Sequence, residues 1–114
     1  MNRIVKGRQL AERCRQAGIT SYMNKQWAQA YMHFEKGCCA ESSNAKLHSN
    51  AAMASIKMGC YAQAIEHCEK VIRIHEFLLD KPEHPMVVKA WQRMAAARVG
   101  LQHFQEAAEV CLCV

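Results

Sequence analysis

Three passages of the chain repeat one pattern of small, aromatic and alanine positions. They span residues 18–34, 52–68 and 95–111. Each passage opens with a small residue and carries an aromatic residue nine positions later, which is Trp27, Tyr61 or Phe104. An alanine follows three positions after the aromatic residue, and an apolar or soft residue stands four positions beyond that alanine. Residues three and four apart share one face of a helix, so the pattern predicts paired helices.

The spacing also predicts how the helices pair. The small residue at the start of each passage, Gly18, Ala52 or Ala95, lets a partner helix approach closely. The aromatic residue begins the second helix and fills the gap at the turn, and the alanine after it admits the first helix. Such an antiparallel pair cannot bury its apolar face alone. Stacking of successive pairs creates a continuous core, as in a helical solenoid.

We expect six helices, over about residues 4–24, 27–39, 46–58, 61–79, 86–99 and 104–113. Ser43 or Asn44 is a suitable N-cap for the third helix. The segment "DKPEHP", residues 80–85, contains both prolines and predicts a break. The aromatic positions are 34 and then 43 residues apart. The nine extra residues lie around positions 75–87 and should lengthen the fourth helix and its following loop.

These elements form one domain over residues 1–114. Its parts are a first repeat at about 11–44, a second at 45–78, an extension at 79–87 and a third repeat at 88–114. Solenoids usually end with a polar capping helix. The chain stops within the last predicted helix, so we expect either a longer protein or a partner that covers this end.

Composition and charge narrow the class of protein. Glycine (5) and proline (2) are scarce, which favours helix over sheet. No apolar run approaches the roughly 20 residues of a membrane span. The seven cysteines are odd in number and follow no signal-peptide pattern, so we expect reduced thiols and a cytoplasmic location, with the nucleus as an alternative. A net charge of +5 suits an acidic partner, but no nucleic-acid motif accompanies it.

One face of the predicted array collects positive charge. The first helix of every pair lines a concave surface with the side chains that do not pack. In the fifth helix we expect Trp91, Met94 and Ala95 to pack inward. The side chains left for the concave surface are Arg15, Ile19 and Tyr22, then Asn50, Met53 and Lys57, then Lys89 and Arg93. This set has four cations, one amide and no carboxylate, which suits an acidic peptide.

The repeats resemble the tetratricopeptide repeat family, whose period is 34 residues. The resemblance implies an all-α solenoid of three helix-turn-helix repeats wound into a right-handed superhelix. Within that family the chain is similar to the carboxylate-clamp subclass found in co-chaperones. Asn50 in "LHSNAA" and Lys89 with Arg93 in "KAWQR" match the clamp, and Lys57 matches an accessory lysine. Arg15 stands where the clamp has a lysine, and Ile19 departs from its usual asparagine.

The resemblance implies a partner and a role for each residue. The partner is the acidic C-terminal tail, ending Glu-Glu-Val-Asp, of heat-shock protein 90 or 70. Lys89, Arg93 and Asn50 would hold the terminal aspartate, and Arg15 would assist at the chain-end carboxylate. Lys57 would steer upstream glutamates, while Ile19, Tyr22 and Met53 would line the apolar part. The parent protein would be a co-chaperone or a complex-assembly factor.

Other interpretations stay open on the sequence alone. Lys89 and Arg93 could belong to an ordinary solvated helix face. The array could be a scaffold module that recognises an internal peptide or a helix in another complex. It could also target a larger enzyme, such as a phosphatase or a peptidyl-prolyl isomerase, whose catalysis lies outside these residues.

The sequence predicts no enzyme, metal or cofactor. Cys38-Cys39 and Cys111-x-Cys113 lack the paired spacing of structural zinc sites. Cys14, Cys68 and Cys111 occupy packing positions. The six histidines are scattered, and no nucleophile turn accompanies His33 or His67. We therefore expect a protein-interaction module.

Overall fold

The computed structural model describes residues 3–113, with side chains described for residues 5–103. This part of the chain is helical and contains no strand. The helices are α1 (Arg3–Met23), α2 (Trp27–Ala40), α3 (Ala45–Lys57), α4 (Tyr61–Arg73), the π-helical segment η1 (Ile74–Leu78) and α5 (Pro85–Cys113). None of the described helices combines the length and apolarity needed to cross a membrane.

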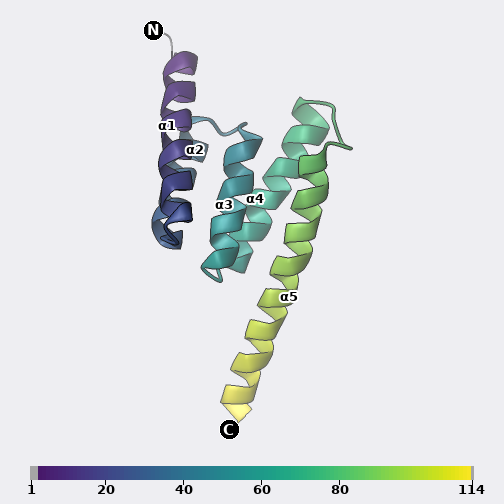
Figure 1. Ribbon diagram of the computed structural model, residues 1–114. Coiled ribbons are helices and arrows are strands. Elements are labelled where there is room, and N and C mark those ends of the chain that lie inside the picture. The colour runs from purple at the N-terminus through teal and green to yellow at the C-terminus, as the bar shows by residue number, and fades with distance from the viewer. Residues whose placement is uncertain (1–2, 114) are drawn as a thin grey trace.

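The helices stack in two layers. In Figure 1, α1, α3 and α5 stand in front, with α2 behind α1 and α4 behind α3. Each helix packs mainly on its neighbours in the chain, so the packing order follows the sequence from α1 to α5. The molecule is elongated, with extents of 61, 31 and 21 Å. This arrangement confirms the predicted all-α solenoid.

Each of the turns within the first two repeats contains one residue in the left-handed backbone region. Lys25 (φ 60°) and Gly59 (φ 76°) hold equivalent positions, two residues before Trp27 and Tyr61. Glycine adopts this conformation without a steric penalty, whereas a lysine does so at some cost. Both residues end the first helix of a pair and redirect the chain.

The third repeat does not turn. Gln102 holds the position equivalent to Gly59, but it remains helical within α5, which continues from Pro85 to Cys113. The predicted separate helices at 86–99 and 104–113 are therefore wrong. Glutamine favours helical over left-handed backbone, and residues 101–103 contain no glycine or proline to interrupt the helix. The side chains of Phe104 and Cys111 lie outside the described residues.

Other predicted boundaries agree with the structure. The Asn44 side chain accepts a hydrogen bond from the Leu47 backbone N–H at 3.2 Å, so Asn44 is the N-cap of α3. The helix predicted to extend to Leu79 continues past Arg73 as the π-helical turn η1. Asp80 (φ 50°) follows this turn and the chain leaves the helix. The proline at the start of α5 fits a first helical turn, where its missing N–H costs nothing.

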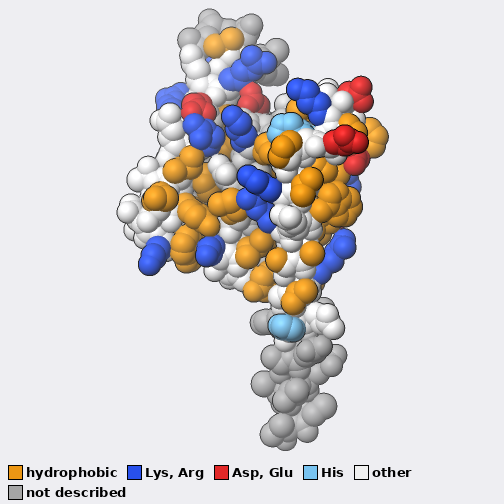
Figure 2. All heavy atoms as spheres, turned by 45° about the vertical axis from the view of Figure 1, so that its right-hand side comes forward, with side chains coloured by type: hydrophobic (Ala, Val, Ile, Leu, Met, Phe, Trp, Pro, Cys, Tyr) orange, Lys and Arg blue, Asp and Glu red, His pale blue; other side chains and the backbone are white. Residues whose placement is uncertain are grey.

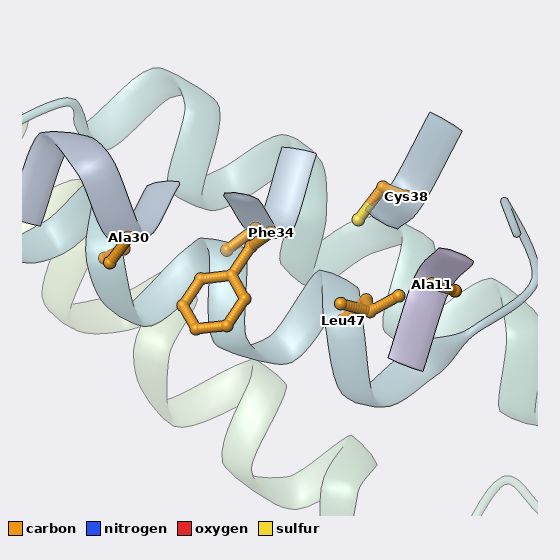
Figure 3. Close-up of a cluster of buried hydrophobic side chains, with 7 residues drawn as sticks. Ala11, Ala30, Phe34, Cys38 and Leu47 are labelled. Atoms are coloured by element: carbon orange, nitrogen blue, oxygen red, sulfur yellow. The ribbon is translucent and has the colours of Figure 1, made fainter. Parts of the chain in front are cut away.

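A first core cluster joins α1, α2 and α3. The Phe34 ring is 2% exposed and lies near Ala30 and Leu47, as Figure 3 shows. A Cβ atom added at Gly18 would lie 2.4–2.9 Å from three atoms of this ring. Only a glycine at this position of α1 therefore allows the helix to approach Phe34 so closely.

A second cluster joins α3, α4 and α5. Ala52 and Cys68 are buried here, at the positions equivalent to Gly18 and Phe34 of the first repeat. The small Cys68 side chain lies opposite an alanine, whereas the large Phe34 ring lies opposite a glycine. On α5 the buried residues are Val87, Ala90, Met94 and Ala97. The expected inward packing is correct for Met94 and wrong for Trp91 and Ala95, which are exposed. Trp91 remains 52% exposed because α5 turns its 87–90–94–97 face, not its 91–95 face, toward α4.

We expect Gly18→Ala to destabilise the domain. The new methyl group would collide with the buried Phe34 ring, and overpacking of this kind costs about 1–3 kcal/mol, against roughly 1 kcal/mol gained in helix propensity. Urea unfolding followed by circular dichroism measures the change. The double variant Gly18→Ala/Phe34→Leu removes the collision and should show a favourable coupling between the two changes. A single variant more stable than the wild type would contradict this account of the packing.

Candidate peptide-binding groove

A groove of about 380 Å³ opens between α1, α3 and α5. It contains six of the eight residues predicted for the concave surface. We call it the cationic groove, and its lining residues are Arg15, Ile19, Lys46, Ser49, Asn50, Met53, Met86, Lys89 and Arg93. Four of these residues are cations and come from all three helices, so the fold brings together charges that are far apart in the sequence.

An apolar pocket of about 230 Å³ continues the cationic groove. Its lining residues are Ile19, Tyr22, Met23, Phe34, Asn50 and Met53. Ile19, Asn50 and Met53 line both spaces. The predicted Tyr22 therefore lies beside the apolar end. A ligand that spans both spaces would meet positive charge at one end and hydrocarbon at the other.

Arg93 reaches across the groove from α5 to α3. Its guanidinium donates hydrogen bonds to Ser49 Oγ and, at 3.1 Å, to Met53 Sδ. Ser49 and Met53 are one turn apart on α3. These contacts hold the cation at a fixed place before any ligand arrives, which reduces the side-chain entropy that binding would otherwise lose.

Lys57 lies apart from the cationic groove. Its Nζ stands 5.4 Å from the centre of the Trp27 ring, in a cation–π arrangement. Trp27 also contacts Tyr22 edge to face, with 4.9 Å between the ring centres. Since Tyr22 lines the apolar pocket, Lys57 is connected to that pocket through these two rings and lines neither space itself.

A carboxylate neutralises one of the predicted cations. Arg15 donates two hydrogen bonds to Glu12, from Nε at 2.9 Å and from one terminal nitrogen at 2.6 Å. These bonds lower the pKa of the Glu12 carboxyl from its usual value to about 2, although Glu12 is exposed. The lining residues of the cationic groove include no carboxylate, in agreement with the expectation, but Glu12 next to the groove pairs with Arg15. The pairing of Glu12 with Arg15 could have been predicted from the sequence, because residues three apart on a helix are neighbours.

Three lining residues were missed by the sequence reasoning. Lys46 and Ser49 come from α3, and Met86 comes from the start of α5. Lys46 could have been found, since it precedes Asn50 by one helical turn on the same face. Its charge also helps to lower the pKa of Glu12, so it acts close to the Arg15 end of the groove.

Figure 2 shows basic side chains among hydrophobic ones across the middle of one face of the molecule. Acidic side chains visible in this view lie along its upper part. This mixture of positive and apolar surface is the chemistry expected of a site for a peptide that carries carboxylates beside an apolar side chain.

The cationic groove holds no histidine or cysteine. Among the described residues, the metal-competent group is Cys38, His48 and His67, which lies behind α3 between α2 and α4. Sequence spacing could not predict this group, because each residue comes from a different helix.

Comparisons with known proteins agree with this fold. No protein-family model matches the chain. The translocon at the outer membrane of chloroplasts 64 from Pisum sativum is 32% identical over 104 residues. This similarity covers 91% of the chain but only 16% of that protein, so the chain spans about one sixth of the length of this curated protein.

A solved structure gives the architecture. The Arabidopsis OM64 TPR domain superimposes with a TM-score of 0.72 at 27% sequence identity. The match covers 90% of this chain and 78% of that one. The fold, the repeated small–aromatic–alanine pattern and this superposition agree with one another. By its fold the chain is therefore a tetratricopeptide repeat domain, an architecture that serves as a protein-interaction scaffold.

Proposed function

We propose that the cationic groove binds the acidic C-terminal tail, of the Glu-Glu-Val-Asp type, of heat-shock protein 90 or 70. The observation that carries this proposal is the convergence of Lys89 and Arg93 from α5 with Asn50 from α3 in one space. Two cations and an amide can hold the two carboxylates of a terminal aspartate by charge-assisted hydrogen bonds. The adjoining apolar pocket suits the valine that precedes this aspartate.

Arg15 has a different part in this proposal. Its guanidinium already binds Glu12, so an acidic ligand has to share Arg15 with that carboxylate or displace it. Lys46, which the sequence reasoning missed, stands in the same groove and supplies a further positive charge. In this proposal Lys46 and Arg15 together replace the single lysine that the clamp usually has at this end. Lys57, held on Trp27, would attract the upstream glutamates from outside the groove.

The domain would work as a docking module of a co-chaperone or complex-assembly factor in the cytoplasm. The name of the pea relative places that protein at the outer membrane of chloroplasts. This name supports a narrower proposal, in which the module faces the cytoplasm at the surface of an organelle and receives a chaperone there. We assign no catalytic step to these residues.

Binding should depend on a free chain end. We expect a tail peptide ending Glu-Glu-Val-Asp to bind in isothermal titration calorimetry and the same peptide with an amidated C-terminus to bind at least about tenfold more weakly. Arg93→Glu should abolish binding of the free peptide. Arg98→Glu is the matched control, since Arg98 lies on α5 outside the groove.

Equal binding of the free and amidated peptides would replace the clamp with recognition of an internal peptide. A loss of binding in Arg98→Glu equal to that in Arg93→Glu would place the site elsewhere on α5.

Ile19→Asn should strengthen binding of the tail peptide. Ile19 lines both spaces and is 37% exposed, so an asparagine fits there and adds an amide donor. A hydrogen bond to a charged group is worth about 1.5–3 kcal/mol, which corresponds to about tenfold or more in affinity. Val99→Asn, an exposed apolar position of α5, is the control. Unchanged or weaker binding in Ile19→Asn would show that the terminal carboxylate does not reach α1.

Glu12→Gln should also strengthen binding, by less than about tenfold and mainly at low salt, because exposed charges are screened. The change releases Arg15 from its competing carboxylate without altering the shape of the side chain. Glu69→Gln, which removes the partner of Arg73 at 3.8 Å, is the matched control away from the groove. Peptide titrations at two salt concentrations measure the effect. Equal affinities of Glu12→Gln and the wild type at low salt would exclude Arg15 from the site.

A further inference from the structure

Three potential metal ligands meet on the opposite side of α3 from the cationic groove. Cys38 comes from α2, His48 from α3 and His67 from α4. Their exposed fractions are 5%, 2% and 4%, and their candidate donor atoms lie within 4.8 Å of one another. None of the three residues lines the groove or the apolar pocket. The proposed peptide site therefore makes no use of them.

Hydrogen bonds fix which nitrogen of each histidine carries a proton. His48 Nε2 lies 2.8 Å from the Ser42 carbonyl oxygen, which can only accept a hydrogen bond. His67 Nε2 lies 3.0 Å from Glu35 Oε2, and an ionised carboxylate also only accepts. Both Nε2 atoms therefore donate, and the Tyr31 hydroxyl, 3.3 Å from His67 Nε2, can accept from the same N–H. In a neutral imidazole the other nitrogen, Nδ1, then carries a lone pair and no proton.

The two Nδ1 atoms face each other at 3.0 Å. Two lone pairs at this distance repel, unless a positive centre lies between them. A proton at this place would make one of the two rings cationic. A metal ion needs both lone pairs and keeps both rings neutral.

The geometry is close to that of a zinc site. Around a tetrahedral zinc ion two nitrogen ligands lie about 3.3 Å apart, and a nitrogen and a sulfur ligand lie about 3.6 Å apart. The observed 3.0 Å between the Nδ1 atoms is within a few tenths of this value. The Cys38 sulfur lies within 4.8 Å of the candidate histidine ligand atoms, so it has to approach by at most about 1 Å.

The groups around these ligands also fit a metal. Metal-binding histidines normally donate their second ring nitrogen to a carboxylate or a backbone carbonyl, as His67 does to Glu35 and His48 to Ser42. The Cys38 thiolate and the Glu35 carboxylate together balance the two charges of a zinc ion. Binding would release the proton of the Cys38 thiol to solvent as the Zn–S bond forms.

We propose that Cys38, His48 and His67 form a zinc-binding site that ties the first repeat to the second, with a water molecule as the fourth ligand. Cys38 belongs to the second helix of repeat one, whereas His48 and His67 belong to the two helices of repeat two. The ion would thus join three helices, in addition to the polar contacts that His67 makes with Glu35 and His48.

Cobalt(II) substitution tests the site, because the absorption of the ion reports both its geometry and a thiolate ligand. The whole 114-residue chain is stripped of metal with a chelator, kept reduced and titrated with cobalt(II). We expect one equivalent to produce tetrahedral visible bands and a thiolate-to-cobalt charge-transfer band, and zinc to abolish both. Cys38→Ser should lose the charge-transfer band. Cys39→Ser, the exposed neighbouring cysteine, should keep it.

Glu35→Gln tests the site without removing a ligand. The loss of an outer hydrogen-bond partner should weaken zinc binding by about 10–100-fold while the cobalt bands remain. This variant keeps the proposal testable if Cys38→Ser fails to fold, which circular dichroism would show. Absence of a charge-transfer band in the wild type would overturn the proposal. Retention of the band in folded Cys38→Ser, or its loss in Cys39→Ser, would do so as well.

Discussion

The close approach of α1 to the Phe34 ring at Gly18 sets the frame for the rest of the molecule. The bare backbone of Gly18 contacts a ring that is almost fully buried, and this contact fixes the distance between the helices of the first repeat. Ile19 follows Gly18 directly, and Arg15 precedes Gly18 by three residues. A wider separation of α1 and α2 would therefore also move two lining residues of the cationic groove.

Helix α3 connects the core, the cationic groove and the group of Cys38, His48 and His67. Ala51, Ala52 and Ser55 are fully buried against its neighbours, and the Ser55 hydroxyl is satisfied by the Ala51 carbonyl at 2.8 Å. Asn50 and Met53 emerge on the groove side. His48 points to the opposite side, toward His67. Small side chains on its packed faces let α3 lie between α2 and α4, so that side chains on its remaining faces reach two separate sites.

Three cations of this face are positioned before a ligand binds. Arg93 is held by Ser49 and Met53, Arg15 by Glu12, and Lys57 by the Trp27 ring. Neutral partners such as Ser49 leave the charge of Arg93 available to an anion. The Glu12 carboxylate instead offsets the charge of Arg15. The electrostatic field of the groove thus comes mainly from α3 and α5, rather than equally from the three helices.

The sequence by itself determined the first four helices, their pairing and most of the groove residues. Spacing of three and four residues fixes which side chains share a helix face, so the places of Arg15, Asn50 and Arg93 follow from local periodicity. Tertiary structure decided what local spacing cannot specify. It rotated α5 so that Trp91 is exposed, continued that helix through Gln102, and brought Cys38, His48 and His67 together. These outcomes depend on the angle and distance at which whole helices pack, which no single segment of the sequence encodes.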